Sequence, residues 1–252
     1  MLAVKIRQII GLCFILCLAG CASKTTTLRH SPNYQASLKE HPEILVLPPT
    51  AEVHRVGVGN QKERLENYES HLESLLAKEL CLILRSKGFQ AETFSKALIH
   101  KQQLGGPLFH LHQRYKEARE TLYKPLAWKE EPAYAIHQPL GLAAINFGKK
   151  IPQSVLLFAD YVGTTKTNGA RALSFVGGFF FDRKELENAD NAVLVVGLVD
   201  AKTGDLIWTN LETDHRNLLY SSLDNLSAQD KVDQKKIRIL AERTLAPLLS
   251  KL

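Results

Sequence analysis

Two long segments with helical periodicity constrain the fold of this chain most strongly. In residues 61–87 the apolar side chains recur at helical spacing and form one stripe. They are Leu65, Tyr68, Leu72, Leu75, Leu76, Leu80 and Ile83. In residues 227–252 the stripe consists of Ile237, Leu240, Ala241, Leu245 and Leu248. Because amphipathic helices must bury their apolar faces, we predict an α/β fold, a mixed β-sheet packed by these two helices.

The ends of the first helix carry recognisable signals. Asn60 followed by Glu63 has the spacing of an N-terminal capping box, in which each side chain satisfies an orphan amide. Gly88 is a residue type that commonly follows a helix C-terminus. The polar, Gly-containing residues 51–60 are predicted to form a loop before the helix.

Several apolar runs between these helices predict strands. The first is residues 43–47, closed by Pro48 and Pro49, and others are expected at residues 89–94 and 154–162. Residues 192–199 and 205–210 flank a turn in which Gly204 supplies the positive φ that a tight hairpin needs. Residues 95–150 contain helix formers interrupted by Gly and Pro, and we predict a helical insertion there.

The amino-terminal 21 residues have the pattern of an export signal. Lys5 and Arg7 precede a stretch, residues 9–20, that is too short to cross a bilayer, which needs about 20 apolar residues. The sequence Leu18-Ala19-Gly20-Cys21 resembles the lipobox of bacterial lipoproteins. This resemblance implies a signal peptide at residues 1–20 and acylation of Cys21; a plain signal peptide or an uncleaved anchor are the alternatives.

The same resemblance predicts location and organisation. Residue 22 is Ala rather than Asp, which by the sorting pattern of that class implies outer-membrane delivery of a periplasm-facing chain. Residues 21–42 are predicted to be the lipidated N-terminus and a flexible tether, and residues 43–252 one α/β domain with the helical insertion at about 95–150. After cleavage and acylation, Cys81 is the remaining thiol, and its apolar neighbours predict a buried structural role.

Catalytic signals are sparse. The chain has no Gly-x-Ser-x-Gly elbow and no phosphate-binding Gly-x-x-x-x-Gly-Lys run. His100, His110 and His112 are the closest histidines, but residues two apart on a helix point in different directions. Asp160 and Asp182 are interpreted as solvated edge or turn residues. We therefore predict no catalytic residues, no metal and no cofactor.

The hairpin carries a second resemblance. Residues 193–208 are similar to the apolar strand, Asp-x-x-Thr-Gly turn and aromatic-ended strand of a superfamily that includes the curli-secretion and penicillin-binding-protein-activator lipoproteins, with folds like the amino-terminal domain of TolB. The order of the preceding elements agrees. The resemblance implies a non-enzymatic accessory or assembly factor that binds another envelope component, in secretion or peptidoglycan machinery. The insertion does not match this pattern, and the amphipathic hairpins of a pore are not evident.

Charge and partners follow from the same observations. The formal charge is +6, but no Lys/Arg stripe indicates nucleic acid. The expected partners are the lipid bilayer, through acylated Cys21, an envelope protein, and a second copy of the chain in a homo-oligomer. Two alternatives stay open: a ring-forming export subunit, and a periplasmic metal-dependent hydrolase using His100, His110, His112 and Asp160.

The apolar residues 175–181 are the most unusual segment. Large exposed apolar patches mark interaction sites, and this segment combines aromatic residues with two glycines. We predict a partner-binding or membrane-proximal edge made by Phe175, Phe179, Phe180 and Phe181. The alternative is a buried strand with a glycine bulge.

Substitution of one phenylalanine separates these two readings. We expect Phe180→Ser to leave the melting temperature unchanged and to weaken association. A buried phenylalanine would instead lose about 3–5 kcal/mol of unfolding free energy. Thermal melting and an association assay on the same variant measure both quantities, and a collapsed melting transition would place Phe180 in the core.

Overall fold

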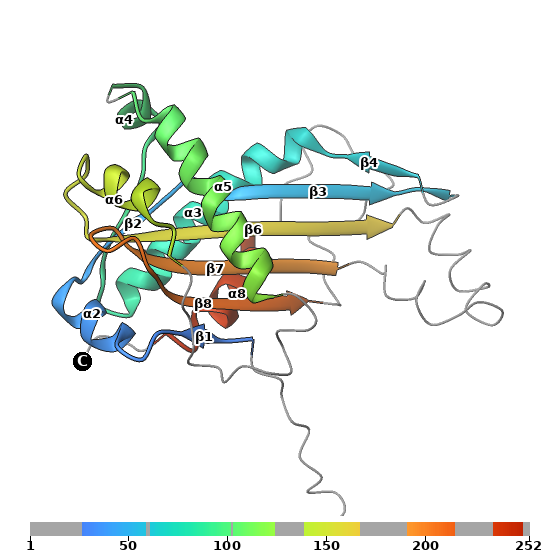
Figure 1. Ribbon diagram of the computed structural model, residues 1–252. Helices are drawn as coiled ribbons and strands as arrows, with labels where there is room; N and C mark the ends of the chain where they lie inside the picture. The colour runs from blue at the N-terminus through green and yellow to red at the C-terminus, as the bar shows by residue number, and fades with distance from the viewer. Residues whose placement is uncertain are drawn as a thin grey trace, which may run out of the picture.

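A computed structural model describes residues 27–58, 61–101, 103–123, 139–166, 191–214 and 234–248. It confirms the α/β class, with helices on both faces of a mixed sheet (Figure 1). The strands are β1 (Arg29–His30), β2 (Glu43–Val46), β3 (Thr50–Val56), β4 (Lys62–Arg64), β5 (Gln90–Thr93), β6 (Val155–Lys166), β7 (Asn191–Asp200) and β8 (Leu206–Asp214). The helices are α2 (Tyr34–Glu40), α3 (Glu66–Ser86), α4 (Lys96–Lys101), α5 (Gly105–Leu122), α6 (Leu142–Gly148) and α8 (Gln234–Leu245). In these ranges, no helix has the length and hydropathy needed to cross a membrane.

Strand β6 organises the sheet because it pairs with two successive strands along one side. Its residues 155–157 lie parallel to β2, and its residues 160–166 lie parallel to β3. The chain passes from β2 to β3 through Leu47, Pro48 and Pro49. On the other side of β6, strands β7, β8 and β1 follow in antiparallel order. The predicted β7–β8 hairpin is confirmed, with Gly204 at φ 78° in its turn.

Helices α3 and α8 cover one face of the sheet, as predicted. The apolar stripe of α3 is buried at Leu72, Leu76 and Leu80, and the predicted inner residues of α8 are all buried. These side chains join one core cluster with Ile44, Leu157 and Trp208 from the strands. The buried, free thiol of Cys81 belongs to the same cluster, which confirms its predicted burial.

The helical insertion forms a third layer on the opposite face (Figure 1). The ring of Tyr115 on α5 stacks on Phe158 of β6 at 4.4 Å between ring centroids. A Cβ atom at Gly197 of β7 would lie 2.6 Å from the Tyr115 ring, so the absence of a side chain there permits this close approach. Gly197 thus lets α5 pack directly on the sheet.

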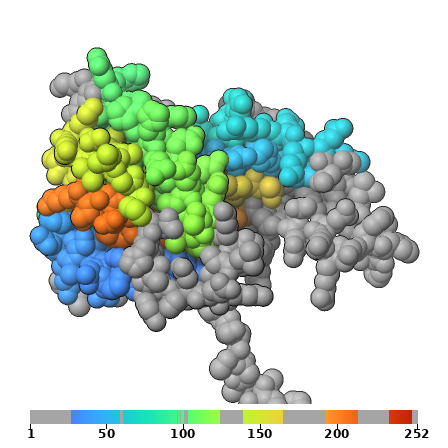
Figure 2. Space-filling view, viewed as in Figure 1, coloured from blue at the N-terminus to red at the C-terminus, as the bar shows by residue number. Residues whose placement is uncertain are grey.

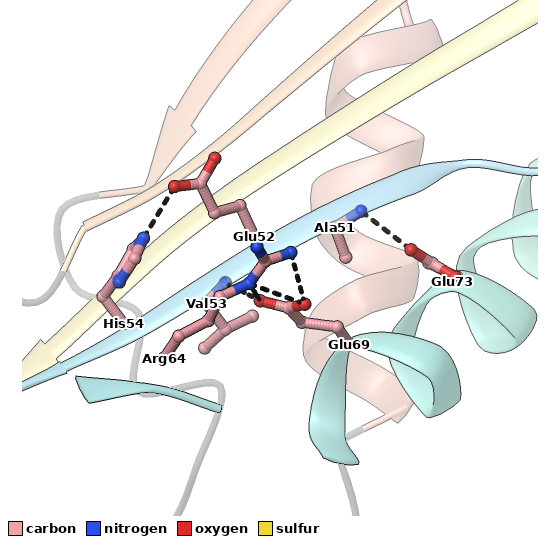
Figure 3. A network of polar contacts seen from close by, with 7 residues as sticks. All are labelled: Ala51, Glu52, Val53, His54, Arg64, Glu69 and Glu73. Atoms are coloured by element: carbon pink, nitrogen blue, oxygen red, sulfur yellow. Dashed lines mark hydrogen bonds and ion pairs between the residues drawn. The ribbon is translucent and has the colours of Figure 1, made fainter. Parts of the chain in front are cut away.

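Helix α3 also satisfies backbone groups at the edges of two strands. Figure 3 shows Glu69 and Glu73 pointing from α3 toward β3, where they accept hydrogen bonds from the amides of Val53 (3.0 Å) and Ala51 (3.2 Å). Near the other end of α3, Arg85 Nε donates to the carbonyl of Ala91 in β5 (2.8 Å). Exposed strand edges invite pairing with other chains, and these side chains occupy the bonds that such pairing would use.

Three local predictions need correction. Residues 29–40 do not belong to a tether: β1 pairs with β8, and Tyr34 and Leu38 of α2 are buried. Residues 51–56 of the predicted loop belong to the strand β3, because pairing with β6 outweighs their polar pattern. Helix α3 begins at Glu66 rather than at residue 61, since residues 62–64 pair with β3 as β4, so Glu63 lies in a strand and not in the first turn of the helix.

Other predicted features lie outside the described residues. These are Cys21, Asp182, the segment 175–181 with its four phenylalanines, and the start of the predicted carboxy-terminal helix at residue 227.

Glu69 is the most heavily bonded of the edge residues. It is 6% exposed, and Arg64 donates three hydrogen bonds to its two oxygens at 2.9–3.1 Å. Burial acts to raise the pKa of Glu69, but the hydrogen bonds from Arg64 and from the Val53 amide outweigh it and hold the pKa below its ordinary value. The ionised form is therefore the one that stabilises the fold.

We expect Glu69→Ala to lower the unfolding free energy at neutral pH by about 1–3 kcal/mol, because the amide of Val53 loses its acceptor. A folded-state pKa below the unfolded value stabilises the fold above the unfolded pKa, and this contribution is lost as pH falls through the folded pKa. The difference in unfolding free energy between wild type and Glu69→Ala should therefore become smaller at acid pH. Urea unfolding at neutral and at acid pH measures this difference. Glu66→Ala, which changes an exposed residue of the same helix, is the control. Equal losses in the two variants would contradict the edge role.

Candidate functional site

A cleft of about 510 Å³ lies between α5 and the strands β3 and β6. Figure 2 shows part of β6, in yellow, reaching the surface between α5, in green, and β3, in blue. The cleft exists because α5 crosses the sheet and leaves the later residues of β6 beyond its cover (Figure 1). Pro48 and Pro49 belong to its lining.

The lining includes a buried polar cluster. Asp160 of β6 stands opposite Thr50 of β3 in the sheet register, and the Thr50 hydroxyl donates to its Oδ1 at 2.5 Å. Arg119 of α5 donates from Nη1 to its Oδ2 at 2.5 Å. The side chains of Asp160 and Arg119 are 9% and 18% exposed. This corrects the prediction of a solvated Asp160: the carboxylate joins three separate elements beneath the surface.

Part of the cleft lining is apolar and accessible to solvent. Phe109 of α5 is 61% exposed and Val162 of β6 is 40% exposed. Both line the cleft together with Leu108 and the two prolines. Exposed aromatic and aliphatic side chains beside charged ones are typical of surfaces that bind a partner.

His112 lines the cleft. Its ring meets Phe158 edge-on at 5.4 Å between centroids. Burial lowers the pKa of His112, and the negative charge of Asp160 opposes that shift only in part. The imidazole is therefore neutral at physiological pH and presents a polar atom without a charge.

The structure divides the histidines considered for a metal site. His112 and Asp160 both line the cleft, whereas His100 and His110 are exposed and lie outside its lining. His110 and His112 both lie on α5, where residues two apart point in different directions, and only His112 lines the cleft. Across the described ranges, no group of three or more His, Cys, Asp or Glu side chains is placed to hold a metal ion.

Several cleft residues were not identified from the sequence. The sequence patterns do not single out Thr50, Phe109, Lys116 or Arg119. Their helical spacing is a partial signal for the site. Phe109, His112, Lys116 and Arg119 are separated by three, four and three residues, so they share one face of a helix. Which strands that face meets could not be read from spacing.

Comparison with known proteins gives fold likenesses at low identity. No family model and no curated protein sequence matches the chain. Among solved structures, a PelC dodecamer from Paraburkholderia phytofirmans is 8% identical with a TM-score of 0.38, covering 89% of this chain and 96% of that one. Lipoprotein GNA1162 from Neisseria meningitidis is 11% identical (TM-score 0.30; 73% and 86% covered). The LpoB C-terminal domain from Salmonella enterica is 12% identical (TM-score 0.26; 73% and 94% covered). Because these TM-scores are all below 0.5, they carry no functional conclusion for this chain.

A double-mutant cycle tests the Arg119–Asp160 pair. We expect Arg119→Met to cost about 3–5 kcal/mol of unfolding free energy, because it leaves a buried carboxylate without its ionic partner. Adding Asp160→Asn should recover part of that loss, since a neutral amide oxygen can still accept from Thr50. Urea unfolding of the two single variants and the double variant gives the coupling. Strictly additive losses would show that the two side chains do not act as a pair.

Proposed function

We propose that this protein is a lipid-anchored, non-enzymatic accessory factor that binds another component of the cell envelope. One observation carries the proposal: the cleft combines an accessible apolar wall with a polar cluster whose charges already neutralise each other. Such an arrangement suits recognition, in which apolar side chains supply contact area and a rigid polar group sets orientation.

The contacts of Asp160 give this carboxylate a structural role. Both carboxylate oxygens of Asp160 accept hydrogen bonds from Thr50 and Arg119, and the Thr50 hydroxyl directs its proton into the cluster. The carboxylate therefore holds β3, β6 and α5 together. This favours a binding module over the hydrolase alternative.

Anchoring at the outer membrane, with the folded body facing the periplasm, is the second part of the proposal. It rests on the export signal and on Leu18-Ala19-Gly20-Cys21. Each buried CH₂ of an acyl chain contributes about 0.8 kcal/mol, so several chains on Cys21 would hold the protein stably at the bilayer. We further propose that Phe175, Phe179, Phe180 and Phe181 contribute to the contact with the envelope partner.

Replacing the lipidation residue tests the proposed anchoring. We expect Cys21→Ser to abolish acylation and to remove the protein from the outer-membrane fraction. Cys17→Ser, the same change inside the predicted signal peptide, is the matched control and should leave acylation and location unchanged. Mass spectrometry of the mature N-terminal peptide and membrane fractionation measure the two effects.

Partner binding is tested separately by quantitative affinity capture from detergent-solubilised envelopes. An accessory factor should retain the same envelope protein in independent preparations, and Phe180→Ser should reduce its recovery. Unmodified Cys21 in the mature protein, or identical fractionation of the two cysteine variants, would contradict anchoring. Absence of any specifically retained envelope component would contradict the accessory role.

A further inference from the structure

We infer that the cleft between α5 and strands β3 and β6 binds a peptide segment of the envelope partner that carries a carboxylate next to an apolar side chain. This inference rests on the proposed function and names the chemistry of the ligand. The charges, the apolar wall and the state of the β3 edge each support it.

Two basic side chains of α5, Lys116 and Arg119, line the cleft. Of the two acidic side chains in the lining, Asp160 is buried and bound by Arg119 and Thr50. The other, Glu52, is 55% exposed and contacts His54 Nε2 at 2.7 Å (Figure 3). Lys116 is exposed and forms no ion pair with any described residue. A carboxylate beside α5 would therefore meet an ammonium group that no described residue neutralises.

Arg119 adds a second reason to expect an anion. A guanidinium has five N–H donors in a planar fork, and the contact with Asp160 is made from Nη1. Its side chain retains 18% exposure within the cleft lining. Arg119 can thus remain bound to Asp160 and donate to a second carboxylate, which Lys116 would help to neutralise.

The apolar wall indicates that the ligand is more than a free anion. Phe109 and Val162 are among the large apolar side chains that the described surface leaves most accessible, and both line this one cleft. Aromatic and arginine side chains are the residues that most often dominate binding energy at interfaces. An apolar side chain adjacent to the carboxylate would cover Phe109 and remove both surfaces from water.

The edge of β3 decides how such a peptide binds. The outward amides of Ala51 and Val53 already donate to Glu73 and Glu69, and the Val53 carbonyl accepts from the Leu65 amide at 2.8 Å. Adding a strand to β3 would require breaking these bonds. The peptide is therefore recognised by its side chains in the cleft rather than by pairing with the sheet.

A phage-displayed library of random peptides, selected on the full-length protein in detergent, tests the inference. We expect enriched sequences to place Asp or Glu next to an apolar residue. A fluorescein-labelled synthetic peptide of the enriched sequence should then bind on the order of tenfold more weakly to Lys116→Glu and to Phe109→Ser than to wild type. Binding should also weaken as salt concentration rises.

Matched controls exist on α3, which covers the opposite face of the sheet. Lys78→Glu makes the same charge change at an exposed lysine, and Leu82→Ser removes a similarly exposed apolar side chain (45%). Both variants should bind the labelled peptide like wild type, and thermal melting of all four confirms that they are folded.

The inference would be overturned if no peptide sequence were enriched or if basic sequences were enriched. Equal losses of peptide affinity in the α5 and α3 variants would also overturn it. Binding of an anionic saccharide, with polygalacturonate as the probe, in place of any peptide would also overturn it and would assign the cleft to a different ligand class. If affinity capture still retains one envelope protein while the library test fails, the accessory function stands and only the assignment of this cleft is wrong.

Discussion

The contact between helix α3 and the edges of β3 and β5 is the interaction on which the rest of the structure depends. Strand β6 pairs first with β2 and then with β3, so the edge of the sheet changes midway along β6 from β5 to β3 and its partner β4. Each edge presents backbone groups that must be satisfied. Glu69 and Glu73 do this for β3 and Arg85 does it for β5, while the apolar stripe of the same helix fills the core beneath.

The opposite face depends on a different kind of fit. Tyr115 stacks on Phe158 and lies over Gly197, so α5 approaches the sheet closely at that point. This position of α5 brings Arg119 within hydrogen-bond distance of Asp160, next to Thr50. The cleft therefore has one wall set by α3, through β3, and another set by the packing of α5. A buried polar cluster joins the two walls and favours a single arrangement, because leaving any member unpaired is costly.

This construction explains why a site with charged residues serves recognition in the proposed function. The charges deepest in the cleft are used by the fold itself, in the pair of Arg119 and Asp160. The groups left for a ligand are the exposed ammonium of Lys116, the remaining N–H donors of Arg119, and the apolar surfaces of Phe109 and Val162. The neutral His112 borders them and adds a polar atom without adding charge.

The sequence by itself determined the elements whose signals are local. The stripes of α3 and α8, strands β2 and β5, and the β7–β8 hairpin with Gly204 could all be predicted, because periodicity and turn chemistry are properties of neighbouring residues. The burial of Cys81 followed from its apolar neighbours. In the site, the helical character of the segment around His112 could be predicted, but the strands on which this helix packs could not.

Only the tertiary structure decided the rest. Residues 50–56 have a polar pattern and became a strand because β6 offers them a paired edge. Residues 29–40 lacked a periodic signal and were ordered by pairing with β8 and by burial of Tyr34 and Leu38. Asp160 appeared to be a surface residue until Arg119, 41 positions away in the sequence, was placed against it. Hydrogen bonds and ion pairs between distant segments depend on how the layers pack, and that packing is not encoded in any single stretch of the chain.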